Sequence, residues 1–195
     1  MSVSIDEQKK AFRTQAKATR LEAFHQVPEA GEQIAQQLLS LAFSTGANIS
    51  AFWPLAEELD TLPLLHALHE QGHQMLLPIM LGAGKPLEFG SWQPGDTLKA
   101  AAFKTLEPSD DKDRLAPNIM LCPLLAFDRR GFRMGYGGGF YDRSIAQLQE
   151  QGDLLTIGIA FAAQEVEAIP IGEYDMPLDM IVTEKEVIDI GVATS

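Results

Sequence analysis

The chain has 195 residues, enough for one sizeable hydrophobic core and short for two, and 46% of them are apolar, as in ordinary soluble globular proteins. The net charge of −12 argues against nucleic acid or an anionic membrane surface as a partner. A single cysteine excludes an internal disulfide, and no run approaches the roughly 18 apolar residues that a membrane span needs. The charged N-terminal segment holds no apolar signal core, so we expect a single cytoplasmic domain over residues 1–195.

Hydrophobic periodicity, prolines and glycines predict helices that alternate with strands along the chain. The helices are expected over residues 5–25, 28–44, 59–72 and 140–152. The strands are expected over residues 47–54, 74–80, 86–92, 118–127, 154–161, 179–184 and 186–190, and the polar segment 93–116 is interpreted as a surface excursion. This alternation predicts an α/β fold with three layers, α/β/α, around a mostly parallel sheet. In such sheets ligands bind beyond the carboxyl ends of the strands.

The segment "AFDRRGFRMGYGGGFYDRS", residues 126–144, gathers arginines and glycines between an apolar strand and a helix. It matches neither common nucleotide fingerprint, because the G-x-G-x-x-G spacing is absent and "LGAGKP" at 81–86 ends in proline where a P-loop needs serine or threonine. Glycines nevertheless let backbone amides approach a phosphate, and the amides of the following helix point to the same place. Arg133 and Arg143 can add charge-assisted contacts, so a small-anion site and a plain surface loop are the two interpretations.

Asp142 indicates which anion such a site would hold. A carboxylate beside bound phosphates is repulsive unless a cation such as magnesium is shared between them, which makes the ligand a magnesium nucleotide. Alternatively, Asp142 is a helix N-terminal carboxylate that suits the helix dipole. Lys9, Arg13 and Lys17 recur at i, i+4 and i+8 on the first helix, where they either present cations together or form a solvated face.

Four blocks of the chain resemble the 5-formyltetrahydrofolate cyclo-ligase family, also called the 5,10-methenyltetrahydrofolate synthetases. The blocks are "KKAFR" at 9–13, "FWPLAEELDT" at 52–61, "LLAFDRRGFRMGYGGGFYDR" at 124–143 and "AFAAQEVEAIP…YDMPLDMIVTE" at 160–184, in the family's order. The resemblance implies a ring closure that depends on ATP and magnesium. The formyl oxygen of 5-formyltetrahydrofolate attacks the γ-phosphate, and the second folate nitrogen then displaces phosphate. The products are 5,10-methenyltetrahydrofolate, ADP and phosphate.

The resemblance also implies which residues form the sites. Its ATP contacts fall on Lys9, Lys10, Ala11, Phe12, Arg13, Arg133, Met134, Gly135, Tyr136, Gly137, Gly138, Gly139, Phe140 and Tyr141. Its folate contacts fall on Trp53, Glu58, Tyr136, Gly137, Gly138, Gly139 and Phe140. Its magnesium ligands fall on Asp142 and Asp175, and Arg133 and Tyr141 are the catalytic candidates.

The residues alone leave several of these assignments open. Trp53 can pack on a flat pteridine or belong to the ordinary core. Glu58 can accept hydrogen bonds from pterin N–H groups or be a plain loop carboxylate. Asp175 is selected by the resemblance alone. Arg129 and Arg130 either bind phosphate or the anionic glutamate tail of folate, or simply face water.

Other chemistry-bearing residues have simpler interpretations. A zinc site at His66, His69 and His73 is disfavoured because His73 lies beyond Gly72, where the helix should have ended. Cys122 is interpreted as a buried structural thiol. Two rival functions are a non-catalytic folate or nucleotide binder on the same fold, and an isomerase or transferase that acts on a phosphorylated sugar. We expect a monomer whose partners are 5-formyltetrahydrofolate and ATP, with neither nucleic acid nor membrane.

Overall fold

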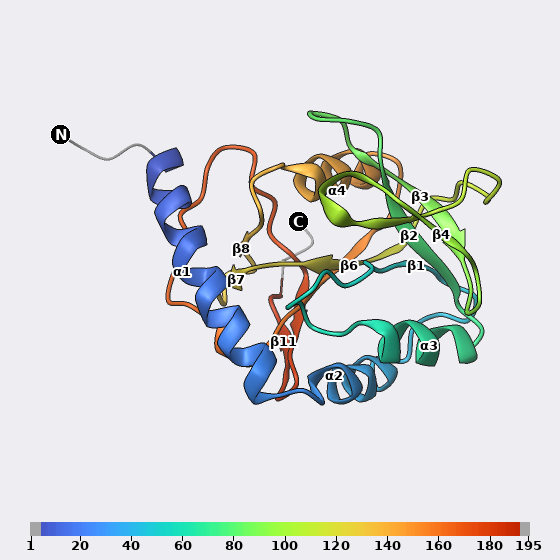
Figure 1. Ribbon diagram of the computed structural model, residues 1–195, viewed down its shortest axis with the longest axis horizontal. Helices are drawn as coiled ribbons and strands as arrows, with labels where there is room; N and C mark the ends of the chain where they lie inside the picture. Colours follow the sequence, from blue (N-terminus) through green and yellow to red (C-terminus); the bar gives the residue numbers. More distant parts are fainter. Residues whose placement is uncertain (1–4, 192–195) are drawn as a thin grey trace.

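One seven-stranded sheet organises the protein, with the strand order β11–β10–β9–β6–β1–β2–β3. The computed structural model, shown in Figure 1, describes residues 5–191, so the expected domain over residues 1–195 extends beyond the described range at both ends. The strands are β1 (Asn48–Ser50), β2 (Gln74–Met80), β3 (Leu87–Trp92), β6 (Ile119–Pro123), β9 (Leu155–Ile159), β10 (Met180–Val182) and β11 (Val187–Asp189). The five inner strands run parallel and the two edge strands antiparallel, which confirms the mostly parallel sheet.

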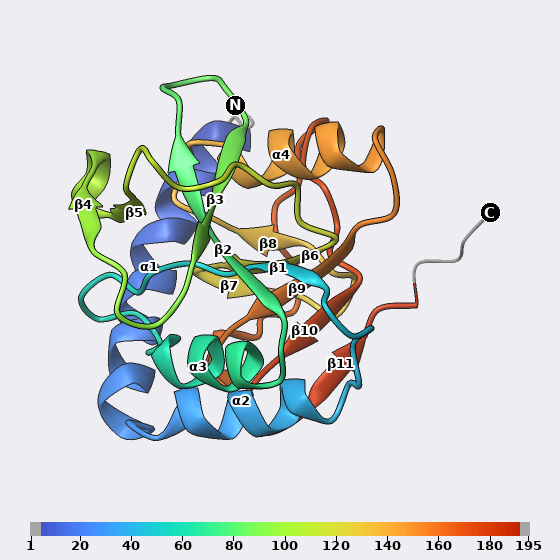
Figure 2. The ribbon, with the colours of Figure 1, turned by 90° about the vertical axis from the view of Figure 1, so that its right-hand side faces the viewer.

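Helices cover both faces of this sheet and one of its ends (Figures 1 and 2). α2 (Ala30–Leu39) and α3 (Leu62–Glu70) lie on one face, α4 (Phe140–Gln149) lies on the other, and α1 (Ile5–Gln26) lies beyond the carboxyl ends of the parallel strands. Ile34 and Leu38 of α2 are buried at helical spacing, and the central strand β6 is buried toward both helical layers. The predicted three-layer α/β/α fold is therefore confirmed. Among residues 5–191, no helix is both long and apolar enough to cross a membrane.

The second helix and the first strand are shorter than the sequence predicts. α2 ends at Leu39 instead of continuing to residue 44, because the amides of Ser40 and Leu41 bond three residues back and Ala42 then takes a left-handed φ of +48°. The expected strand 47–54 pairs as β1 over 48–50 only. The chain turns soon afterwards, where the amide of Glu58 donates to the carbonyl of Leu55 at 3.1 Å.

The polar segment 93–116 carries more structure than a surface excursion. It forms a hairpin of β4 (Leu98–Ala100) and β5 (Leu106–Pro108), joined through the 3₁₀ turn η1 (Ala102–Lys104). Glu107 anchors this hairpin to the sheet, because its buried carboxylate accepts a hydrogen bond from the amide of Met80 at 2.9 Å. The tip carries Phe103, which is exposed and has a left-handed φ of +55°.

The predicted strand 118–127 is divided into two. β6 ends at Pro123, and the next residues form a separate hairpin of β7 (Ala126–Phe127) and β8 (Arg133–Met134). The break arises because the buried Gln164, in the 3₁₀ turn η2 (Ala162–Gln164), donates to the carbonyls of Leu124 and Leu125 at 2.8 and 3.0 Å. The arginine- and glycine-rich segment 126–144 therefore begins with this hairpin, and its glycines at 135–139 follow β8 and not the central strand directly.

Candidate functional site

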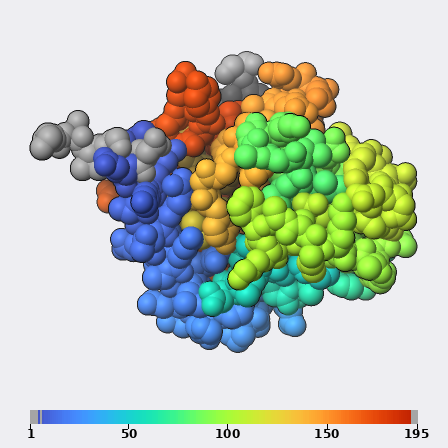
Figure 3. Space-filling model, turned by 45° about the horizontal axis from the view of Figure 1, so that its top comes forward, coloured from blue at the N-terminus to red at the C-terminus, as the bar shows by residue number. Residues whose placement is uncertain are grey.

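The residues that the resemblance selects come from separate segments that meet at the carboxyl ends of the parallel strands. Trp53 and Glu58 follow β1, and the glycine loop, residues 135–139, joins β8 to α4. α1 runs alongside the loop, and Figure 3 shows the loop at the surface between α1 and the β3–β5 region. This is the edge at which α/β sheets commonly bind ligands.

The glycine loop docks on the basic face of α1. Arg13 Nε donates to the carbonyl oxygen of Gly135 at 3.0 Å. Gly137 has a φ of +100°, and a Cβ there would lie 3.1 Å from the Arg13 guanidinium carbon. Gly139, with a φ of +63°, is the residue from which α4 begins. The left-handed backbone angle favours glycine at both positions, and at Gly137 the close approach of Arg13 favours it as well, so the loop places its backbone against Arg13 there.

The expected ATP block on α1 does not face the loop as a whole. Lys9 and Arg13 point toward the glycine loop and its neighbours, whereas Lys10 and Ala11 are exposed. Phe12 packs into a small apolar cluster that also holds the buried Met134. A helix turn distributes five consecutive residues around its circumference, so only part of such a block can contact one ligand.

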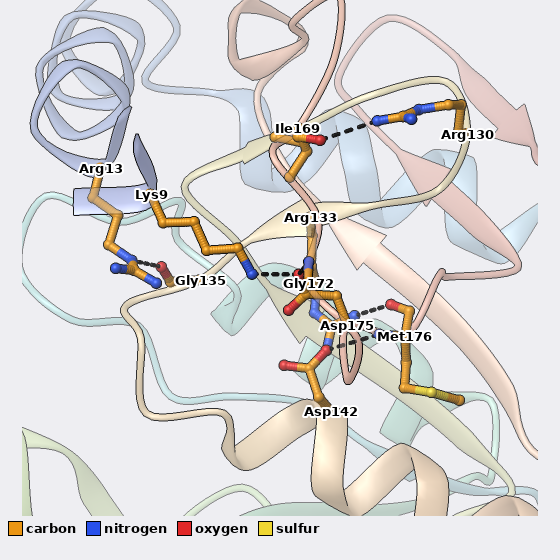
Figure 4. A network of polar contacts seen from close by, with 10 residues as sticks. All are labelled: Lys9, Arg13, Arg130, Arg133, Gly135, Asp142, Ile169, Gly172, Asp175 and Met176. Atoms are coloured by element: carbon orange, nitrogen blue, oxygen red, sulfur yellow. Dashed lines mark hydrogen bonds and ion pairs between the residues drawn. The ribbon is translucent and has the colours of Figure 1, made fainter. Parts of the chain in front are cut away.

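Two carboxylates and two cations form a compact network beside the loop (Figure 4). Asp142 Oδ1 accepts hydrogen bonds from Arg133 Nη2 at 3.0 Å and from the amide of Met176 at 3.1 Å. Arg133 Nη1 also donates to the carbonyl of Met176 at 2.8 Å. Asp175 pairs with Lys9 and accepts a hydrogen bond from the amide of Gly172 at 2.7 Å. Asp142 therefore binds the amide that directly follows Asp175 in the chain, and each of the two predicted magnesium ligands is paired with a cation.

Glu58 forms a second, deeper network with two residues from other elements. Its Oε1 accepts from Arg20 Nη1 at 3.0 Å and from the Tyr136 hydroxyl, and its Oε2 accepts from the amide of Leu55 at 2.9 Å. Tyr136 also accepts a hydrogen bond from Arg20, and Lys17 Nζ lies 5.6 Å from the centre of its ring. The network joins α1, the segment after β1 and the glycine loop.

The aromatic candidates differ in what they can do. Burial and the hydrogen bond to Glu58 raise the pKa of Tyr136 to about 12, and burial raises the pKa of Tyr141 well above its ordinary value. Both phenols therefore stay protonated near neutral pH. Trp53 is half-buried and packs edge-to-face on Trp92, with ring centres 6.1 Å apart, so it belongs partly to the core.

The adjacent pair Arg129 and Arg130 is occupied by protein acceptors. Arg129 Nε donates to Glu165 at 2.6 Å, and its Nη2 donates to Glu186 at 2.8 Å. Arg130 Nη2 donates to the fully buried Asp128 at 2.6 Å and to the carbonyl of Ile169 at 3.0 Å, away from the loop in Figure 4. These contacts fix the β7–β8 turn.

The histidines and the cysteine have structural surroundings. His66 packs edge-to-face on Trp92, and His73 packs on Phe43, where burial lowers the pKa of His73. Across residues 5–191, no three histidine, cysteine or acidic side chains gather in a way that could hold a metal ion. Burial raises the pKa of the Cys122 thiol to about 12, which fits an unreactive structural cysteine.

Two residues of these networks were not selected by sequence reasoning. Arg20 lies three residues after Lys17, so it falls on the same helix face as Lys9, Arg13 and Lys17. The helical periodicity that indicated those three residues therefore also includes Arg20. Asp128 gives no comparable signal, because its burial follows from a turn that the sequence pattern does not show.

The fold and site define an α/β protein with a glycine loop and cationic helix at the carboxyl edge of its sheet, and comparisons with known proteins identify the family. A profile of the 5-formyltetrahydrofolate cyclo-ligase family matches residues 5–184. The chain is 34% identical over 169 residues to the 5-formyltetrahydrofolate cyclo-ligase of Escherichia coli K12, covering 83% of this chain and 92% of the relative. It is 30% identical over 186 residues to the 5-formyltetrahydrofolate cyclo-ligase of Mycolicibacterium smegmatis, covering 89% of this chain and 94% of the relative.

A solved structure agrees with these relatives. The NMR structure of Aquifex aeolicus 5,10-methenyltetrahydrofolate synthetase superposes with a TM-score of 0.76 at 26% identity, covering 96% of this chain and 95% of that one. The chain therefore belongs to the 5-formyltetrahydrofolate cyclo-ligase family, as its sequence predicted, and it is an enzyme of that class.

Proposed function

We propose that the protein converts 5-formyltetrahydrofolate to 5,10-methenyltetrahydrofolate and consumes ATP, which leaves as ADP and phosphate. Family membership supports the cyclo-ligase activity. The observation that carries the proposal for this chain is the position of the glycine loop. On one side it contacts Arg13 of the proposed nucleotide site, and on the other it sends Tyr136 to Glu58 of the proposed folate site. One loop thus adjoins both proposed substrates.

The formyl oxygen is a poor nucleophile and a poor leaving group, and the proposed reaction uses ATP to convert it into a phosphate that can leave. The formyl oxygen bonds to the γ-phosphorus, and the bond between that phosphorus and the β–γ bridging oxygen breaks, which releases ADP. The second folate nitrogen then bonds to the activated formyl carbon and loses its proton, and the carbon–oxygen bond breaks to release phosphate. The protein's part is to bring the two substrates together and to compensate the charge of the moving phosphoryl group.

The cationic residues support this assignment of roles. Lys9 and Arg13 are one helical turn apart on α1 and reach the loop and its neighbour Asp175. We infer that phosphate oxygens replace Asp175 as the partner of Lys9 when ATP binds. The side chain of Arg133 is 4% exposed and is committed to Asp142 and Met176. Its supported role is therefore to orient Asp142.

The pair Asp142 and Asp175 has the donor chemistry of a magnesium site that also uses phosphate oxygens. Magnesium is bound in such sites by one or two carboxylates together with phosphates and water, so two carboxylates are sufficient. Magnesium would neutralise charge on the phosphates there. Asp142 and Asp175 would hold it, with Asp175 released from Lys9 and Asp142 still oriented by Arg133.

The test is a coupled measurement of both products. The protein is mixed with 5-formyltetrahydrofolate, ATP and magnesium, and the ultraviolet absorbance of methenyltetrahydrofolate is followed while ADP is assayed. We expect the two products at one to one, each requiring both substrates. Tight binding of 5-formyltetrahydrofolate by folded protein without turnover would instead favour a non-catalytic binder, and binding of ribose phosphates but not folate would favour a sugar-phosphate enzyme.

A further inference from the structure

Arg20 is the most deeply placed cation of α1 at the site. It is 8% exposed, and it reaches Glu58, which is 6% exposed, and the hydroxyl of Tyr136. Arg13 contacts the loop and Lys9 contacts Asp175 nearer the start of the helix, so Arg20 lies about two turns from Arg13 and about three from Lys9. Of its two contacts, Glu58 is proposed to bind folate alone, and Tyr136 lies in the loop that is proposed to contact both substrates.

We propose that Arg20 is a positioning residue for folate, which holds the Glu58 carboxylate in the orientation that accepts the pterin N–H groups. The proposal rests on the proposed function, in which Glu58 contacts the pterin. Arg20 itself is buried behind Glu58 and acts through that carboxylate.

The acceptor sites of Glu58 explain how the arrangement works. An ionised carboxylate offers about four lone-pair sites. Arg20 and Tyr136 donate to the two lone-pair sites of Oε1, and the Leu55 amide donates to one of the two on Oε2. One lone-pair site of the carboxylate, on Oε2, is then left for a ligand. A pterin presents an amino group and a ring N–H side by side and so needs two. Release of one present partner supplies the second.

Tyr136 is the partner that is free to leave. Tyr136 is 45% exposed and lies between Gly135 and Gly137 of the loop. Arg20, in contrast, is buried, and the Leu55 amide belongs to the turn that Leu55 and Glu58 close. When folate binds, a pterin N–H group then takes the place of the Tyr136 hydroxyl as a donor to Glu58, while Arg20 and the Leu55 amide keep the carboxylate fixed. The exchange also gives the glycine loop a different contact when folate is bound.

A purely structural role accounts less well for Arg20. Buried ion pairs contribute little net stability compared with apolar packing, because both charges lose their water. Arg20 Nε is in addition buried without a hydrogen-bond partner among the described residues, which is a further cost. An interaction that costs stability and yet fixes a substrate-binding carboxylate is expected at a site of function.

The test separates binding from stability with a double-mutant cycle. Arg20→Met removes the cation and keeps much of the volume, and Glu58→Gln removes the carboxylate charge. We expect Arg20→Met to raise the KM for 5-formyltetrahydrofolate about tenfold or more and the KM for ATP less than about threefold. Added to Glu58→Gln, it should have less than about twofold further effect, because Arg20 acts through Glu58. Additive effects, or equal changes in both KM values, would overturn the proposal.

Two further variants complete the design. Arg20→Lys keeps a cation near Glu58 and should recover part of the folate affinity, and it also serves if Arg20→Met does not fold. Arg114→Met removes an arginine whose ion pair with Glu88 lies outside the site and should leave both KM values unchanged. Folate affinity is also measured without turnover, by tryptophan fluorescence. An inactive wild type would remove the proposed function, whereas an active wild type with unaltered folate affinity in both Arg20 variants would remove the role of Arg20.

Discussion

Gly137 illustrates how one residue joins the glycine loop to α1. Its φ of +100° is accessible to glycine at little cost, and its missing side chain lets the Arg13 guanidinium lie against the loop backbone. Any side chain at this position meets both constraints together: the backbone must relax, and Arg13 must move away from a Cβ only 3.1 Å from its guanidinium carbon. Because Arg13 is a proposed ATP contact, the consequence should appear in the use of ATP.

Gly137→Ala is therefore expected to raise the KM for ATP about tenfold, with a smaller change in the KM for 5-formyltetrahydrofolate. Gly46→Ala is a matched control, since Gly46 also has a left-handed φ, of +73°, but a Cβ there would meet nothing within 4 Å. Both variants should lose stability through backbone strain of about 1 kcal/mol. If Gly46→Ala impairs ATP use as strongly as Gly137→Ala, then strain alone explains the effect and the contact with Arg13 does not.

At the scale of elements, the 172–176 segment is held between α1 and the start of α4. Lys9 of α1 pairs with Asp175. Asp142, at the start of α4, accepts a hydrogen bond from the amide of Met176 and pairs with Arg133. Substitution at Asp142 therefore changes the proposed magnesium site and the anchoring of a whole segment. The two effects can be separated by comparing magnesium dependence with stability.

Asp142→Asn keeps the shape of the side chain and removes its charge. We expect the magnesium concentration that supports half-maximal activity to rise about tenfold or more. The free energy of unfolding should fall by about 1.5–3 kcal/mol, because the buried Arg133 guanidinium then donates to a neutral amide oxygen and has lost its anionic partner. Magnesium titration of the activity and urea unfolding measure the two quantities. Asp110→Asn, in an exposed ion pair with Lys99, should change neither. Unchanged magnesium dependence with full turnover would exclude Asp142 as a ligand.

The elements that were predicted correctly are those whose pattern is local. α3 and α4 carry periodic apolar residues that end near Gly72 and Gly152, and β2 is a continuous apolar run. The division of 118–127 into β6 and β7 was missed because its cause is Gln164, about forty residues later in the chain. The site followed the same rule. Lys9 and Arg13 could be predicted from their helical spacing, whereas Asp175 carries no local signal and was predicted through the family resemblance alone.

The whole molecule combines a strongly acidic surface with a locally cationic edge. The net charge is −12, yet Lys9, Arg13, Lys17 and Arg20 lie along one helix beside the glycine loop. The parallel strands β1 and β6 end at that same edge, where the segment after β1 meets the glycine loop that follows the β7–β8 hairpin, and no local pattern could specify this meeting. Behind the site, the central strand β6 is buried between both helical layers and carries the single cysteine of the chain.

Cys122 makes the stability of the whole fold sensitive to alkaline pH. Burial raises the pKa of its thiol from an ordinary value of 9.0 to about 12. Between these two pH values the unfolded chain loses the proton while the folded protein retains it, so unfolding releases about one proton. The free energy of unfolding should therefore be fully retained below about pH 9 and should fall by about 1.4 kcal/mol per pH unit above it from this group alone.

Cys122→Ala isolates this contribution from that of Tyr136, whose pKa is also raised and which is present in both proteins. Below pH 9 the variant should be less stable than the wild type by a constant amount, because removing the buried sulfur leaves a cavity. Above pH 9 the wild type should lose stability faster, so the difference between the two proteins should narrow by about 1.4 kcal/mol per pH unit. Urea unfolding of both proteins from pH 7 to 10.5 measures that difference. Parallel pH profiles would mean that the thiol ionises as readily in the folded protein as in the unfolded chain, and that β6 is open to solvent at Cys122.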